Sequence, residues 1–243
     1  MKTPPVNWTE FLGVAKQVGF AMPFGSDARF LYSWLAFVYS DSEKEFRFDF
    51  SQDNPNKPIS ETMKLFTNLN VQKLIDNGLF RFNNGAYGGH QNDFGNELDK
   101  TGMMILPSGW KNKLPNQLIN DDVTLAPVPV GPSGITSVPT FSTSSFVVSS
   151  NGKHSKEAWE FHNWLNAQQP GKETSVLGDW LIMQNLIPTK KSDLEAADKV
   201  SDVVQREYIL LLKEARGLSA EDWNPEKLEK VSKTIQKLVS GET

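Results

Sequence analysis

The chain has 243 residues, of which 38% are hydrophobic and 22% charged, and it contains no cysteine. This composition is typical of a globular protein with one large core or two modest ones, and it excludes disulfides, thiolate metal sites and cysteine nucleophiles. The formal net charge of -4 comes from 25 basic and 29 acidic residues without a long run of one sign, so the sequence lacks the basic footprint of a nucleic-acid-binding protein.

The first part of the chain predicts helices and strands in alternation. Asn7 and Glu10 resemble a capping box, and apolar residues follow them at helical spacing. The run from 30 to 39 is apolar nearly all round, which predicts a buried helix. The predicted elements are a helix over 8–18, a strand over 20–24, a buried helix over 30–39, an exposed strand over 45–50 and a helix over 60–77.

The stretch from Phe94 to Trp110 is the most informative segment. A polar approach leads into a short apolar strand, residues 103–106, and a Pro-Ser-Gly-Trp turn follows. Trp110 is therefore predicted at the outer end of a strand, where open α/β sheets bind their ligands. A tryptophan after a strand also commonly packs into a core, so this pattern alone leaves both roles open.

The second half of the chain predicts two further strands and several helices. A strand over 123–130 contains Pro127 and Pro129, and a glycine-rich turn over 131–134 follows it. A strand over 146–148 precedes a helix over 155–167, and the remainder is helical apart from 185–191. The tryptophans on these helices and on the buried helix are expected to pack in cores. They are Trp34, Trp159, Trp164 and Trp180.

Seven short motifs follow one another in a fixed order along the whole chain. They are Pro4 to Phe11, Trp34 on its apolar helix, Asn96 to Trp110, Ala126 to Pro129 with the glycine turn, Ser145 to Ser150 with Glu157 to Phe161, Leu186 to Thr189, and Leu238 to Glu242. The series resembles the extracellular solute-binding proteins of family 1, the maltose-binding type. Asn7 stands where that family has a threonine. The resemblance implies an α/β fold of the periplasmic binding protein type II.

The resemblance also implies which parts of that fold the chain contains. Residues 1–126 and 178–243 would belong to the C-terminal lobe, and residues 127–177 would be the return segment of a partial N-terminal lobe. Relatives begin with a further N-terminal-lobe segment, so we expect a fragment. Without that segment, strand edges and apolar helix faces would be uncovered unless the missing segment or a second chain supplied their partner.

The function implied by the resemblance is reversible binding of an extracellular mono- or oligosaccharide. Two lobes would close about a hinge and deliver the sugar to the membrane permease of an ABC importer. The protein would be extracellular or periplasmic, anchored as a lipoprotein in its full-length parent. Aromatic rings and hydrogen-bonding side chains suit a sugar. The expected ligand-binding residues are Trp110, Trp223, Ser26, Asp27, Arg29 and Tyr87, with Asp27 also suited to capping a helix.

Two other functions stay open on the sequence. A carbohydrate-active hydrolase needs two carboxylates across a sugar, and Asp93, Glu97 and Asp99 show no spacing that favours this over a solvated acidic face. The three histidines lack metal-ligand spacing. The sequence therefore predicts no catalytic residue, no metal and no cofactor. The remaining alternative is an interaction or scaffold fragment that binds no sugar.

Overall fold

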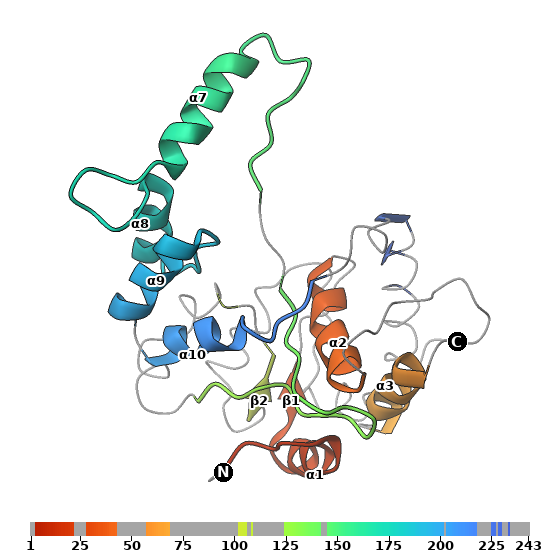
Figure 1. Cartoon of the computed structure of the whole chain (residues 1–243). Helices are drawn as coiled ribbons and strands as arrows, with labels where there is room; N and C mark the ends of the chain where they lie inside the picture. The colour runs from red at the N-terminus through yellow and green to blue at the C-terminus, as the bar shows by residue number, and fades with distance from the viewer. Residues whose placement is uncertain are drawn as a thin grey trace. The chain divides into compact units, whose positions relative to one another are not determined.

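The computed structural model describes residues 3–21, 28–42, 57–68, 102–105, 108, 124–141, 145–201, 203–217, 225–226, 228–229 and 233 (Figure 1). These residues fall into two compact units. Unit 1 comprises Met1–Leu106, Lys113–Phe141 and Glu214–Thr243, and unit 2 comprises Pro107–Asn112 and Ser142–Lys213. The lobe boundaries expected from the sequence stay a prediction.

Unit 1 begins with the helix that the capping-box pattern predicts. Helix α1 spans Trp8–Val18, and the Asn7 side chain accepts a hydrogen bond from the Glu10 amide at 3.0 Å. The Glu10 carboxylate in turn accepts from the Asn7 side-chain amide at 2.9 Å and from the Val6 amide at 3.1 Å. These bonds satisfy backbone donors that a helix start leaves free. Gly19, at a φ of 78°, ends the helix in a conformation that glycine adopts without strain.

The core of unit 1 is built around α2, which spans Ala28–Ser40. Between Ser33 and Ser40 every residue of α2 is buried, which confirms the predicted buried helix. Phe37 lies at its centre, with its ring centroid 5.5 Å from that of Phe11 and 5.3 Å from that of Phe66 in α3, Lys57–Asn68. Burial of each such aromatic side chain stabilises the fold by roughly 1.5–3 kcal/mol.

The strands of unit 1 are very short. Strand β1, Phe20–Ala21, pairs in parallel with β2, Met103–Met104, at the register Phe20 to Met103. Gly102 approaches Val18 so closely that an added Cβ would lie 2.6 Å from the Val18 Cβ. Two of the predicted strands, over 20–24 and 103–106, are therefore confirmed at Phe20–Ala21 and Met103–Met104, whereas Ile105 lies outside β2.

The predicted α/β fold of the periplasmic binding protein type is wrong. Helices account for 54% of the interpretable residues and strands for 6%, and the described strands amount to one pair of two residues each with isolated bridges. Residues 124–129, in a segment predicted as a strand, form no ladder, and Pro127 and Pro129 have no amide donor to contribute to one. Residues 146–148, also predicted as a strand, form no ladder either. Because the hinge closure was inferred from the periplasmic binding protein fold, it has no structural support once that fold is wrong.

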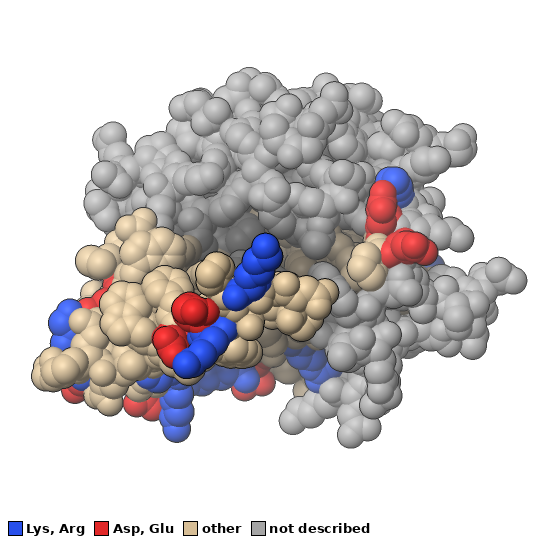
Figure 2. Space-filling model, turned by 90° about the horizontal axis from the view of Figure 1, so that it is seen from above, with Lys and Arg blue, Asp and Glu red and all other residues tan. Residues whose placement is uncertain are grey.

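The described part of unit 2 is helical. Its helices are α7, Ser155–Asn166, α8, Val176–Met183, α9, Lys191–Val200, and α10, Val203–Leu211. They confirm the predicted helix over 155–167 and helices in the sequence that follows, but residues 212–217, predicted as helical, form a turn and the bridge between Thr140 and Arg216. Figure 2 shows acidic and basic side chains interspersed on the described surface seen from above.

Candidate functional site

The structure leaves the predicted sugar-binding residues untested. Ser26, Asp27, Tyr87, Trp110 and Trp223 lie outside the described residues. Arg29 lies in the first turn of α2, but its side chain is not described. The roles of all six therefore stay predictions, and what the structure describes is the framework of the two units.

That framework brings together motifs that are far apart in the sequence. The Trp8 amide donates to the Val130 carbonyl at 3.1 Å, and the Val130 amide donates to the Val6 carbonyl at 3.0 Å. The Trp8 indole also donates to the Pro129 carbonyl at 3.1 Å in a buried position. The first and fourth motifs of the series thus form one parallel bridge, which the sequence pattern alone did not predict.

The glycine turn after the bridge is fixed against the end of α2. Its predicted turn is confirmed, since the Gly134 amide donates to the Gly131 carbonyl at 3.1 Å. The Gly131 amide donates to the Ser40 carbonyl at 2.9 Å, and the Ser133 amide to the buried Asp41 carboxylate at 2.7 Å. A Cβ on Gly131 would collide with Asp41, so the close approach requires glycine.

Unit 2 holds its two central helices together with a buried polar cluster. Ser175 caps α8 by accepting the Gly178 amide at 3.0 Å, and its own hydroxyl donates to Asp193 at 2.6 Å. Asp193, only 2% exposed, also accepts the Ser175 amide at 2.8 Å. Because these groups form hydrogen bonds with one another, the cluster is best explained as a structural helix cap.

A second polar cluster lies nearer the surface of the same unit. Asp179 accepts hydrogen bonds from Lys172, Thr174 and Gln169, the last at 3.0 Å. The hydrogen bond from Lys172, followed by that from Thr174, lowers the pKa of the Asp179 carboxyl. A carboxylate held ionised in this way orders the chain before α8 and is poorly suited to act as a general acid.

Exposed aromatic side chains are the most distinctive feature of unit 2. Trp159 is 53% exposed, Phe161 58% and Trp164 56%, and α7 contains no buried residue. The rings of Phe161 and Trp164 stack with centroids 5.7 Å apart and an interplanar angle of 26°, whereas Trp159 meets His162 edge-on at 5.4 Å. The expectation that the tryptophans of α7 pack in a core is therefore wrong.

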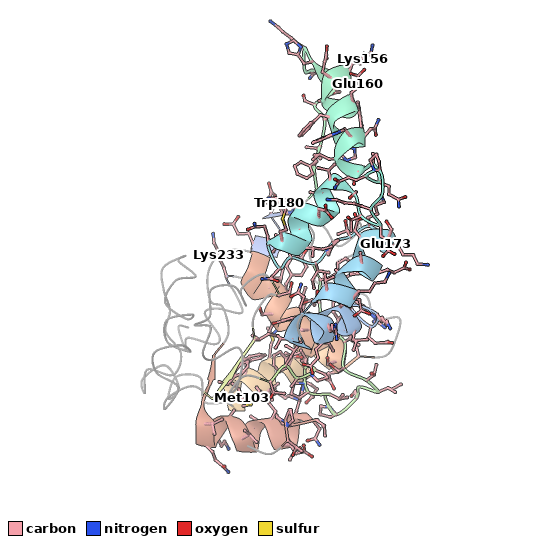
Figure 3. The ribbon with its side chains drawn as sticks, turned by 90° about the vertical axis from the view of Figure 1, so that its left-hand side faces the viewer. Met103, Lys156, Glu160, Glu173, Trp180 and Lys233 are labelled. Carbon is pink, nitrogen blue, oxygen red and sulfur yellow. The ribbon has the colours of Figure 1, made fainter. Side chains whose placement is uncertain are left out.

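The core-packing expectation divides accordingly. Trp34, at 1% exposure, confirms it, whereas Trp159, Trp164 and Trp180 contradict it. Figure 3 shows Trp180 on α8, with Lys156 and Glu160 nearer the N-terminal end of α7. Aromatic residues at helical spacing do not reveal whether the chain contains the surface that would bury them. A helical projection of α7 places its aromatic residues on more than one side, which would have indicated that a single core could not bury all of them.

Some kinds of site are not found in the described part of the chain. No group of three or more His, Cys, Asp or Glu side chains there could hold a metal ion. Among the helices with described residues, none is long and apolar enough to cross a membrane. Neither a protein-family model nor a curated protein sequence matches the chain.

Proposed function

We propose that this chain binds an extracellular carbohydrate reversibly and serves an ABC importer by delivering it to the membrane permease. The observation that carries the proposal is the bridge in which Trp8 and Val130 join two motifs of the sequence series. The bridge supports treating these two motifs as parts of one framework, while the ligand class rests on the chemistry of the residues that the resemblance selects.

The chemistry of the expected site residues favours a sugar. The indoles of Trp110 and Trp223 offer flat faces for the apolar side of a sugar ring, and Ser26, Asp27 and Arg29 offer partners for its hydroxyl groups. The protein would meet such a ligand outside the cell or in the periplasm. Neither catalysis nor a cofactor is required for this function.

Isothermal titration calorimetry against a panel of mono- and oligosaccharides tests the proposal. We expect binding of at least one sugar, and Trp110→Ala and Trp223→Ala should each lower its affinity about tenfold, which corresponds to ~1.4 kcal/mol. Trp180→Ala is the matched control, because Trp180 is half-exposed and lies outside the expected site. It should leave the affinity unchanged.

The same panel separates the two alternatives. Chromatography of each sugar after prolonged incubation would reveal products if the chain were a hydrolase, whereas a binding protein returns the sugar intact. Absence of a heat signal from every glycan, with a folded protein by circular dichroism, would contradict sugar binding and favour an interaction or scaffold fragment.

A further inference from the structure

An Asn-Gly pair lies in an exposed turn just before α7. The chain has three such pairs, at 77–78, 84–85 and 151–152, and the last of them falls within the described residues. Asn151 and Gly152 are both exposed, and the Gly152 amide donates to the Ser149 carbonyl at 3.1 Å. A hydrogen bond between residues three apart is typical of a β-turn. Water and hydroxide can therefore reach both residues of the pair from solvent.

We propose that Asn151 is a deamidation site, which converts spontaneously to aspartate and isoaspartate. The proposal goes beyond sugar binding, and it does not depend on it. Asparagine is one of the heat-labile residues of proteins, and its side chain reacts when the next backbone nitrogen reaches the side-chain carbon. Glycine favours this approach most, because it lacks a Cβ and adopts backbone conformations that other residues rarely reach.

The reaction consumes one water molecule and releases one ammonia molecule. A base from solvent removes the Gly152 amide proton, and the nitrogen forms a bond to the Asn151 Cγ. The bond from Cγ to Nδ2 breaks, Nδ2 leaves as ammonia, and a five-membered succinimide ring remains. Water then opens the ring at one of its two carbonyl carbons. Opening at Cγ gives aspartate, whereas opening at the backbone carbonyl carbon gives isoaspartate, in which the main chain runs through the former side chain.

The structure permits this reaction at Asn151 and opposes it at three other described asparagines. The Asn7 side chain caps α1, and the Asn166 side chain donates to a carbonyl one turn earlier at 2.9 Å. Asn163 lies within α7, where helical hydrogen bonding fixes the backbone. At Gly152 the turn hydrogen bond must open first, and this requires little free energy because the neighbouring residues 149–154 are all exposed.

Conversion would change the chain directly before α7. One added carboxylate takes the formal net charge from -4 to -5. Isoaspartate adds one carbon to the backbone, so the turn between Ser149 and Gly152 cannot keep its hydrogen-bonding geometry. Helix α7 has no side-chain hydrogen bond at its N-cap, His154, to fix its start independently of that turn. The modification therefore alters both the charge and the backbone path of the connection into α7.

Peptide mapping by mass spectrometry, after incubation of the folded chain at mildly alkaline pH, tests the proposal. Asn151 should convert to both products with first-order kinetics, and the rate should rise with pH because the Gly152 nitrogen must lose its proton. Since the turn is exposed, the rate constant should lie within about tenfold of that in urea, where the chain is unfolded. In the folded chain, Asn163 should react at least about tenfold more slowly than Asn151.

Gly152→Ala tests the role of the glycine nitrogen. The added Cβ hinders the approach of this nitrogen, so the rate constant at Asn151 should fall at least about fivefold. Gly13→Ala is the matched control, because it makes the same exchange at an exposed glycine of α1, and it should leave the rate at Asn151 unchanged. Both variants are also compared in urea, so that the result does not depend on how well they fold.

Two results would overturn the proposal. One is an intact Asn151 in the folded chain after an incubation that converts it in urea, because the turn would then protect the pair. The other is aspartate as the sole product with an unchanged rate in Gly152→Ala, because direct hydrolysis by water would then replace the succinimide route.

Discussion

Trp8 shows how much one side chain contributes to the framework. Its ring is 6% exposed and belongs to the core of unit 1, and its indole donates to a carbonyl 121 positions along the chain. The capping pair of Asn7 and Glu10 fixes the helix start from which this ring projects. Trp8 thus stabilises the framework in two ways, through burial of its apolar ring and through one hydrogen bond from its indole.

Trp8→Phe separates these two contributions. Phenylalanine retains an aromatic ring but leaves the buried Pro129 carbonyl without its donor, so we expect the free energy of unfolding to fall by about 1–2 kcal/mol. Urea unfolding followed by circular dichroism measures the change. The control, Trp180→Phe at a half-exposed position, should lie within about 0.5 kcal/mol of the wild type. Equal losses in both variants would contradict a specific role for the indole hydrogen bond.

At the scale of elements, two glycines occupy different kinds of position. One lies in the interior of a helix, and the other lies where two segments approach each other closely. Gly13 lies exposed within α1, and a Cβ there would meet nothing within 4 Å. Gly131 lies against the Asp41 side chain at the end of α2. The same substitution should therefore have opposite effects at the two positions.

The matched pair Gly13→Ala and Gly131→Ala tests this contrast. Gly13→Ala should raise the free energy of unfolding by about 0.5–1 kcal/mol, because alanine loses less backbone entropy in a helix. Gly131→Ala should lower it by about 1–3 kcal/mol, because the added methyl group overpacks a buried contact. Differential scanning calorimetry gives both changes, and the same sign at both positions would refute the close-approach argument.

Local pattern predicted the helices well and the sheet poorly. Capping at Asn7 and apolar periodicity through α2 are encoded within a few neighbouring residues, so both could be predicted from the sequence. Strand pairing depends on partners elsewhere in the chain, and Pro127 and Pro129 removed donors from a segment whose composition otherwise favours a strand. The site residues were selected through resemblance, and their positions lie outside the described residues apart from the backbone of Arg29.

At the scale of the whole molecule, burial is uneven between the two units. Helix α2 is enclosed on all sides over most of its length, whereas α7 contains no buried residue. Local opening requires little free energy where few apolar contacts are lost. The two helices should therefore differ in how often their backbone hydrogen bonds open.

Amide hydrogen exchange read by mass spectrometry measures this difference. We expect amides of α7 to exchange at least about 100-fold faster than those of α2. Equal protection of α2 and α7 would contradict the uneven distribution of stability.

The parallel bridge between Asn7 and Val130 also sets an order of events during synthesis. Helix α1 emerges from the ribosome well before the carbonyl that receives its indole, which lies 121 residues later. At about 5–20 residues per second, the apolar face of α1 waits roughly 6–24 s for that partner. Helix α1 is thus made well before it can reach its final contacts, and a chaperone has time to bind it in that interval.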